Sequence, residues 1–137
     1  MSNGTNLVNL DYQAATRAQA ALANVNSGNA ATMDTVATNA LGVLLEMGVY
    51  SCCLFLLSRR QAAHKKHARA LLKELITLLG KLPFSKSGEP PDPGNAQATL
   101  GYVTENVTKN LDHVLLTRQV FEQMLLYVRY GAAALKS

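Results

Sequence analysis

Residues 61–79 have the sequence QAAHKKHARALLKELITLL, which contains the clearest helical pattern of the chain. Its apolar residues recur every three or four positions, and this spacing places them along one side of an α-helix. They are Ala68, Leu71, Leu72, Leu75, Leu78 and Leu79. Gly80 and Pro83 follow, and both residue types favour the end of a helix. The segment therefore predicts an amphipathic helix whose leucines face a hydrophobic core.

The same helix carries a basic stripe beside its leucines. Lys65, Arg69 and Lys73 follow one another at intervals of four residues, and Lys66 lies next to them. Like charges at this spacing destabilise an isolated helix by roughly a few tenths of a kcal/mol per pair, so a bound anion would relieve the repulsion. The stripe is extended at its two ends by four further bases, which are Arg59, Arg60, Lys81 and Lys86.

The positive charge of the chain is concentrated in this part of the sequence. The whole chain has a net charge of +4, but residues 59–86 hold eight bases and one acid, a net charge of +7. Residues 1–58 and 87–137 have net charges of −2 and −1. A concentrated patch is typical of a surface that binds a polyanion, because each neutralised phosphate releases condensed counterions. We therefore predict a sugar-phosphate partner, and the alternative is an ordinary solvated lysine face.

Two helices are predicted before this segment. Apolar residues at helical spacing indicate residues 7–25 and 32–47. The second helix is expected to begin at an Asp or Thr oxygen near its first residue and to end at Gly48. Its residues expected to face the core are Val36, Ala40, Val43, Leu44 and Met47. Residues 49–57 are apolar nearly all round, so they form either a short buried helix or a continuation kinked at Gly48, in the middle of the core.

The second half of the chain predicts a linker and two more helices. Residues 82–95 contain all four prolines of the chain and several Gly and Ser residues, which indicates a flexible linker. Asn95 can cap a helix over residues 96–111. A last helix is expected after His113 and ends at Leu135.

These patterns predict an all-α fold, a compact single-domain bundle of five to six helices over residues 1–137. Cys52 and Cys53 are adjacent and lack metal-ligand spacing, which favours a reducing compartment. Residues 1–6 lack the basic and apolar regions of a secretory signal. The longest apolar stretch, residues 41–57, is shorter than the roughly 20 residues that cross a membrane. We therefore expect a cytoplasmic protein without membrane contact.

The sequence contains no pattern that predicts catalysis. It lacks a glycine-rich phosphate loop, a nucleophile elbow and paired carboxylates. His64 and His67 have the spacing to share a metal ion, but no further ligand is placed to complete a coordination shell. We therefore predict a binding protein that is not an enzyme, with no catalytic residue, no cofactor and no metal site.

Arginines outside the basic stripe are open to two interpretations. Arg118, Arg129 and Lys136 return to one face of the last helix, because spacings of 11 and 7 residues are close to whole turns. This face can bind RNA, or Arg118 can form an ion pair with Glu122 four residues later. Arg17 can equally bind a ligand or pair with a buried acid.

Two segments of the chain resemble a known family. They are residues 47–60, MGVYSCCLFLLSRR, and residues 113–135, HVLLTRQVFEQMLLYVRYGAAAL. Together with Arg17 in an alanine-rich first helix, they resemble the small subunit of the type III-B CRISPR effector, the Cmr complex. The matching positions are Gly48, Phe55, Arg59, Thr117, Arg118, Arg129 and Tyr130. The family commonly has Tyr, Trp and Lys at the positions occupied here by His113, Leu126 and Val128.

The resemblance implies a non-catalytic subunit that acts in antiviral defence. Such a subunit stacks in several copies along the crRNA-bearing backbone, contacts the backbone subunits and the large subunit, and lines the path of single-stranded target RNA, which partner subunits cleave. The RNA-binding residues predicted from the stripe and from the resemblance are Arg59, Arg60, Lys65, Lys66, Arg69, Lys73, Arg118 and Arg129. Because aromatic residues are few, we expect contact with the RNA backbone and not with its bases.

Two other interpretations compete with this one. A helical adaptor or secretion-type chaperone would hold a partner helix in an apolar groove and meet an acidic protein with its basic stripe. Such an adaptor should ignore oligonucleotides at physiological ionic strength. A histidine-dependent metal enzyme would contain metal when purified and would lose activity on His64→Ala.

Overall fold

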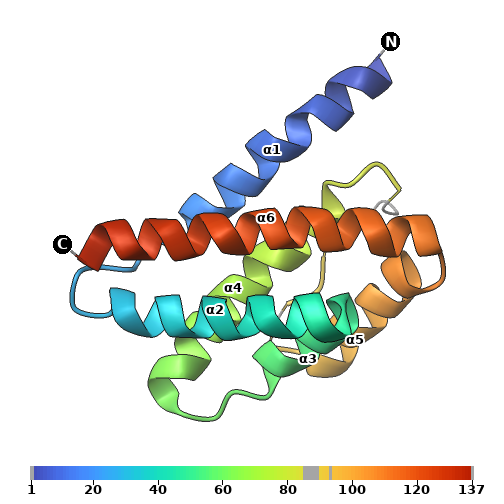
Figure 1. The fold of residues 1–137 in the computed structure, drawn as a ribbon. Coiled ribbons are helices and arrows are strands. Elements are labelled where there is room, and N and C mark those ends of the chain that lie inside the picture. The colour runs from blue at the N-terminus through green and yellow to red at the C-terminus, as the bar shows by residue number, and fades with distance from the viewer. Residues whose placement is uncertain (1, 85–89, 93, 137) are drawn as a thin grey trace.

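The computed structural model describes residues 2–84, 90–92 and 94–136, with the backbone alone for residues 2–8 (Figure 1). Over this part of the chain the fold is all-α, as predicted, and contains no strand. The elements in chain order are α1 (Ser2–Ala21), α2 (Ala30–Met47), α3 (Val49–Leu57), α4 (Ala62–Gly80), α5 (Ala96–Val103), the π-helical segment η1 (Thr104–Thr108) and α6 (Leu111–Lys136).

The bundle is built around a pair of antiparallel helices. α2 and α6 lie side by side along most of their length, and α4 crosses behind them in Figure 1. α4 contacts α1, α2, α3 and α6, so its inner face forms the centre of the core. The N-terminal part of α1 projects from the bundle, while its C-terminal part packs against α4 and α6.

The leucine face predicted for α4 is confirmed. All six apolar residues of the predicted arc are fully buried: Ala68, Leu71, Leu72, Leu75, Leu78 and Leu79. Full burial of one leucine side chain contributes about 1.5–3 kcal/mol. This inward face fixes the rotation of α4 about its own axis, and therefore also the direction of the basic side chains on its outer face.

The predicted bounds of α1 are wrong at both ends. The helix begins at Ser2 and ends at Ala21, not at residues 7 and 25. Val25 is buried, but it lies in a turn where its N–H donates to the carbonyl of Leu22 at 2.9 Å. Val25 follows Ala21 by four residues, so its buried side chain continues the helical spacing although its backbone is not helical. The side chain of Leu7, the first residue of the predicted helix, lies outside the described residues.

α2 begins without the predicted cap. It starts at Ala30, and the expected Thr and Asp oxygens lie inside the helix, where Thr35 Oγ1 donates back to the carbonyl of Ala31 at 3.0 Å. Gly48 does form the C-cap, with φ of 100° and its N–H donating to the carbonyl of Leu44 at 2.9 Å. Met47 was expected to face the core but is 70% exposed, because the chain turns at Gly48 and leaves the last turn of α2 open.

The apolar segment after Gly48 forms a separate short helix, α3. One of its faces is buried as predicted, at Val49, Cys52, Cys53 and Leu56. Burial raises the pKa of the Cys52 thiol to about 12, and burial beside Cys52 raises the pKa of Cys53 well above its ordinary value. Both thiols are therefore protonated and unreactive at neutral pH. The prediction of burial all round is wrong for the other face, which is open to solvent.

The proline-rich stretch is held at both of its described ends. Leu82 is buried, and the ring of Phe84 stacks on His113 with centroids 3.9 Å apart. Residues 85–89 and 93, six of the fourteen positions of the predicted linker, lie outside the described residues. At the far end, Asn95 caps α5 as predicted, since its side-chain oxygen accepts from Ala98 N at 3.0 Å.

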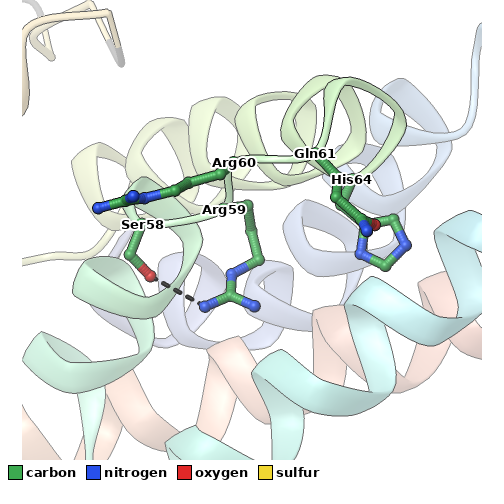
Figure 2. A pocket seen from close by; sticks show the side chains of 5 residues that line it. All are labelled: Ser58, Arg59, Arg60, Gln61 and His64. Carbon is green, nitrogen blue, oxygen red and sulfur yellow. Dashed lines mark hydrogen bonds between the residues drawn. The ribbon is translucent and has the colours of Figure 1, made fainter.

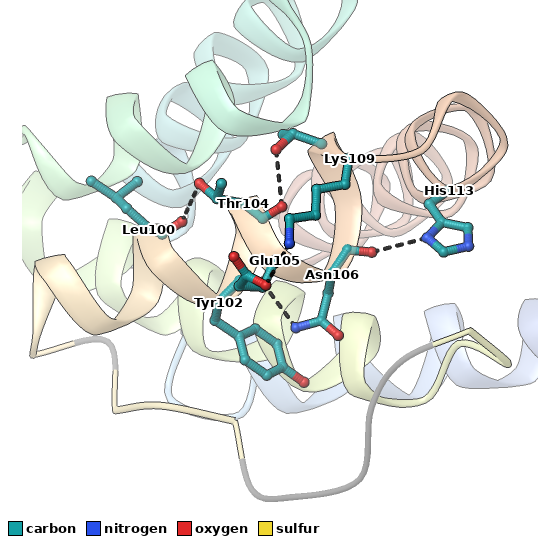
Figure 3. A network of polar contacts seen from close by, with 8 residues as sticks. Leu100, Tyr102, Thr104, Glu105, Asn106, Lys109 and His113 are labelled. Carbon is teal, nitrogen blue, oxygen red and sulfur yellow. Dashed lines mark hydrogen bonds and ion pairs between the residues drawn. The ribbon is translucent and has the colours of Figure 1, made fainter.

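The helix predicted over residues 96–111 is interrupted by η1 (Figure 3). In this segment Asn106 is buried and its side-chain amide donates to the carbonyl of Tyr102 at 2.9 Å. The carbonyl of Asn106 in turn lies 3.3 Å from Nδ1 of His113. α6 then begins at Leu111, ahead of the predicted start, because Asn110 Oδ1 accepts the N–H groups of Asp112 and His113 at 2.8 and 3.3 Å.

Candidate nucleic-acid interface

The basic side chains of α4 share the face that points away from the core. Lys65, Lys66 and Lys73 are all exposed, opposite the buried leucines. Arg69 lies between them on the same face, is only partly exposed and has an interaction of its own. The α4 basic face is therefore defined by Lys65, Lys66 and Lys73, without Arg69.

The only acid of residues 59–86, Glu74, does not neutralise this face. It is 8% exposed and its Oε1 lies 2.9 Å from Nη1 of Arg17 on α1. A partly buried carboxylate needs such a partner because desolvation of a lone charge is costly. This ion pair also decides between the two interpretations of Arg17, which pairs with a buried acid. α4 therefore presents its lysines outward and its single carboxylate inward.

A polar depression lies at the start of α4 (Figure 2). It has a volume of about 510 Å³ and is lined by Ser58, Arg59, Arg60, Gln61 and His64. Arg60 is exposed and points away from Arg59 in Figure 2. Gln61 is the N-cap residue of α4 but makes no side-chain capping bond, so the first turn keeps its N–H groups for other acceptors. The positive end of the helix dipole adds to the charge of Arg60 here.

Arg59 is held in one position by three contacts. Its Nε donates to the carbonyl of Phe55 at 3.2 Å, and its Nη2 donates to Ser58 Oγ at 3.1 Å. Its guanidinium carbon lies 4.0 Å from the centroid of the Phe55 ring, a cation–π contact. Arg59 is therefore turned toward α3, although the sequence placed it with the bases of α4.

The histidines of α4 point to different places. His64 lines the polar depression, whereas His67 is buried next to the end of α1, where it borders a small cleft with Lys66. Burial lowers the pKa of His67, and the charges of Lys66 and His64 lower it further, so His67 is neutral at pH 7. Among the described residues no three His, Cys, Asp or Glu side chains are grouped to hold a metal ion.

Arg118 and Arg129 are not part of the α4 basic face. Nη2 of Arg118 donates to the carbonyl of Leu45 near the end of α2 at 2.8 Å, so the ion pair expected with Glu122 does not form. Nε of Arg129 lies 3.8 Å from Asp34 Oδ1 on α2, and Lys136 Nζ binds the other oxygen of Asp34 at 2.8 Å. The three bases do share one face of α6, as predicted, but that face packs against α2.

The structure also shows a second surface that the sequence analysis assigned to the core. It is an apolar groove of about 370 Å³ between α2 and α3, lined by Val43, Met47, Ser51, Leu54, Phe55 and Ser58. No local signal distinguishes it from core, because an apolar residue has the same periodicity whether another part of the chain covers it or not.

Comparison of the chain with protein-family models, with curated proteins and with solved structures gives no match. In the part of the chain that the structure describes, no helix is both long enough and apolar enough to span a membrane.

Proposed function

We propose that this chain is a non-catalytic RNA-binding subunit, and that its α4 basic face holds the sugar-phosphate backbone of single-stranded RNA. One observation carries the proposal: Lys65, Lys66 and Lys73 point outward together, while Glu74 is turned inward to Arg17. Uncompensated lysines on one face attract a chain of phosphates, and binding is strengthened by the counterions that the RNA releases. Arg60 and the open first turn of α4 extend the surface by one further phosphate contact.

The composition of this face favours the RNA backbone over its bases. α4 contains no Phe, Tyr or Trp, and the exposed tyrosines Tyr12, Tyr50 and Tyr130 lie on α1, α3 and α6. Base recognition on single strands depends on aromatic faces on which bases stack. Lysine contacts to phosphates carry no sequence information. The proposed binding is therefore independent of RNA sequence.

The resemblance to the Cmr small subunit extends the proposal to an assembly. In such an assembly, several copies of the chain would stack along the crRNA-bearing backbone in the cytoplasm. They would contact the backbone subunits and the large subunit, and would line the path of the target RNA during antiviral defence. One copy offers only a few phosphate contacts, so its own affinity is weak. Several linked copies on one strand bind much more tightly, because each later contact forms at a high effective concentration.

The test compares two variants that have the same net charge. Lys65→Ala with Lys73→Ala removes two lysines of the α4 basic face, whereas Lys109→Ala with Lys136→Ala removes two lysines that form ion pairs elsewhere. Fluorescence anisotropy with labelled single-stranded RNA of several sequences, over a range of salt concentrations, measures affinity. The first variant should weaken binding equally for all sequences and lower the slope of log K against log salt by about 1.4, since each phosphate contact contributes roughly 0.7.

The control variant should bind RNA like the wild type, and circular dichroism should show unchanged helicity in both. Equal losses in the two variants would mean that only net charge matters, which contradicts a defined face. Unchanged affinity after loss of Lys65 and Lys73 would remove α4 from the site.

A helical adaptor for an acidic protein is the second candidate function. The apolar groove between α2 and α3 favours it, because a groove of this kind fits a protein segment better than a nucleic acid. An adaptor predicts that an acidic protein or peptide binds α4 and that RNA does not compete with it. Competition by single-stranded RNA at physiological ionic strength would exclude this function for the α4 basic face.

A further inference from the structure

The groove between α2 and α3 is an open, largely apolar depression of the surface. Its most open residues are Met47, which is 70% exposed, and Leu54, which is 46% exposed. Gly48 makes the turn that sets the end of α2 against α3, so residues of both helices line the same groove. Two helices with a groove between them form the kind of site that accepts the apolar side of a third helix.

The composition of α3 explains why the surface exists. Its nine residues, VYSCCLFLL, include no charged side chain, and only one of its faces is buried in the core. The other face exposes Leu54 together with Tyr50, which is 39% exposed. Clustered apolar residues on a surface are typical of sites that contact another protein. This face has the composition of a docking surface, and the charge beside it bears on the kind of partner it suits.

Arg59 does not itself line the groove, but it lies against two residues that do. Phe55 and Ser58 line the groove, and both hold Arg59, the first by its ring and carbonyl and the second by its hydroxyl. These hydrogen bonds use donors on Nε and Nη2, and a guanidinium has five donors in total, so donors remain for an incoming acceptor. A guanidinium that is already fixed loses little entropy when it binds a carboxylate.

We infer that this groove binds an amphipathic helix of a protein partner, with apolar residues in the groove and an acidic residue against Arg59. A nucleobase fits less well, because the Phe55 ring already carries Arg59 on one face and the other large apolar side chains of the groove are aliphatic. The inference does not depend on RNA binding, since none of the lysines of the α4 basic face lines the groove. The two surfaces allow the chain to bind RNA and a protein at the same time.

The experiment selects helical peptides from a displayed random library on the full-length chain. The enriched peptides should carry apolar residues at positions i, i+3 or i+4, and i+7, with Asp or Glu toward one end. A synthetic peptide of this pattern is then titrated by fluorescence anisotropy against the wild type and two variants. Leu54→Glu should weaken its binding at least about tenfold. Arg59→Glu should weaken it as well, and a peptide with Lys in place of the acid should recover binding to that variant.

The matched control is Leu115→Glu, which makes the same change at a leucine of α6 that is 54% exposed and does not line the groove. It should bind the peptide like the wild type. Failure to enrich such peptides, or equal binding to Leu54→Glu, overturns the inference. Self-association that is lost in Leu54→Glu, measured by sedimentation, would identify a second copy as the occupant instead. Loss of RNA affinity in Leu54→Glu would identify a nucleobase.

The groove and the α4 basic face can be tested separately. Lys65→Ala with Lys73→Ala should keep full peptide affinity, and Leu54→Glu should keep full RNA affinity. Either surface can therefore fail its test while the other passes.

Discussion

Glu74 is the residue that decides how much charge the α4 basic face presents. If the side chain of Glu74 were exposed beside Lys73, its negative charge would partly neutralise the lysines of the α4 basic face. Here it is turned into the protein because Arg17 on α1 supplies an opposite charge 2.9 Å away. Arg17 thus acts on the basic face from a distance, by keeping the only nearby carboxylate of α4 out of it.

The Arg17–Glu74 pair can be tested by its effect on stability. Arg17→Met leaves the mostly buried carboxylate of Glu74 without its partner. The free energy of unfolding should fall by roughly 2–4 kcal/mol. The lower part of this range applies because Arg17 is partly exposed. Arg17→Met combined with Glu74→Leu should recover most of the loss, because two apolar residues replace the pair. Urea unfolding measures both. Additive losses in the double variant would show that the two residues do not interact.

Asp34 gives a prediction for the dependence of stability on pH. The hydrogen bond from Lys136 lowers its pKa below the ordinary value of 3.8; burial opposes this, and the charge of Lys136 lowers it further. A group with a lowered pKa stabilises the folded state above its unfolded pKa, and this contribution is lost as the pH falls through the folded pKa. Lys136→Met should therefore reduce stability by about 0.5 kcal/mol at pH 7.

The difference between wild type and Lys136→Met should shrink as the pH falls below about 3.8, where Asp34 becomes protonated. Thermal unfolding at neutral and acid pH measures it. A difference that persists in acid would show that Lys136 acts through the packing of its aliphatic chain.

At the level of secondary-structure elements, Gly48 separates two helices that would otherwise continue into one. Its φ of 100° lies in the region that glycine adopts readily and other residues adopt at a cost. The turn lets α3 pack its inner face on the core while its outer face forms the groove with the end of α2. Both the groove and the position of Arg59 after α3 follow from this single turn.

Alanine substitutions at two glycines of the same region should therefore have opposite effects. A Cβ at Gly48 or at Gly42 would meet no other atom within 4 Å, so neither change is opposed by a clash. Gly48→Ala should destabilise the protein by roughly 1–2 kcal/mol, because alanine resists a positive φ. Gly42→Ala, in the exposed middle of α2, should stabilise it by up to about 1 kcal/mol. Equal effects, measured by urea unfolding, would contradict a role for the backbone conformation at Gly48.

In the whole molecule, bases with the same sequence signal have different roles. The lysines of α4 point to solvent, Arg17, Arg129 and Lys136 bind carboxylates of other helices, and Arg118 binds a backbone carbonyl. In the part of the chain that the structure describes, the exposed lysines of the α4 basic face therefore concentrate positive charge more sharply than the net charge of +4 suggests. This face and the apolar groove are separate surfaces, as the proposal that the chain binds both RNA and a protein requires.

The amino-acid sequence alone determined the all-α class, the buried leucine face of α4 and the caps at Gly48 and Asn95. Each of these depends on neighbouring residues within a few turns, where periodicity and backbone preferences act directly. The outward direction of the α4 lysines follows from the same periodicity. These features needed no knowledge of the partners of each helix.

The tertiary structure decided the rest, because it depends on residues far apart in the chain. Arg17 could not be assigned to Glu74 across 57 positions, nor Arg118 to a carbonyl of α2 across 73 positions, by any local pattern. The same holds for Met47 and Leu54, which have the spacing of core residues but lie at a surface that no other helix of the described chain covers. Burial and ion pairing depend on which helices meet, and only the packed fold determines that.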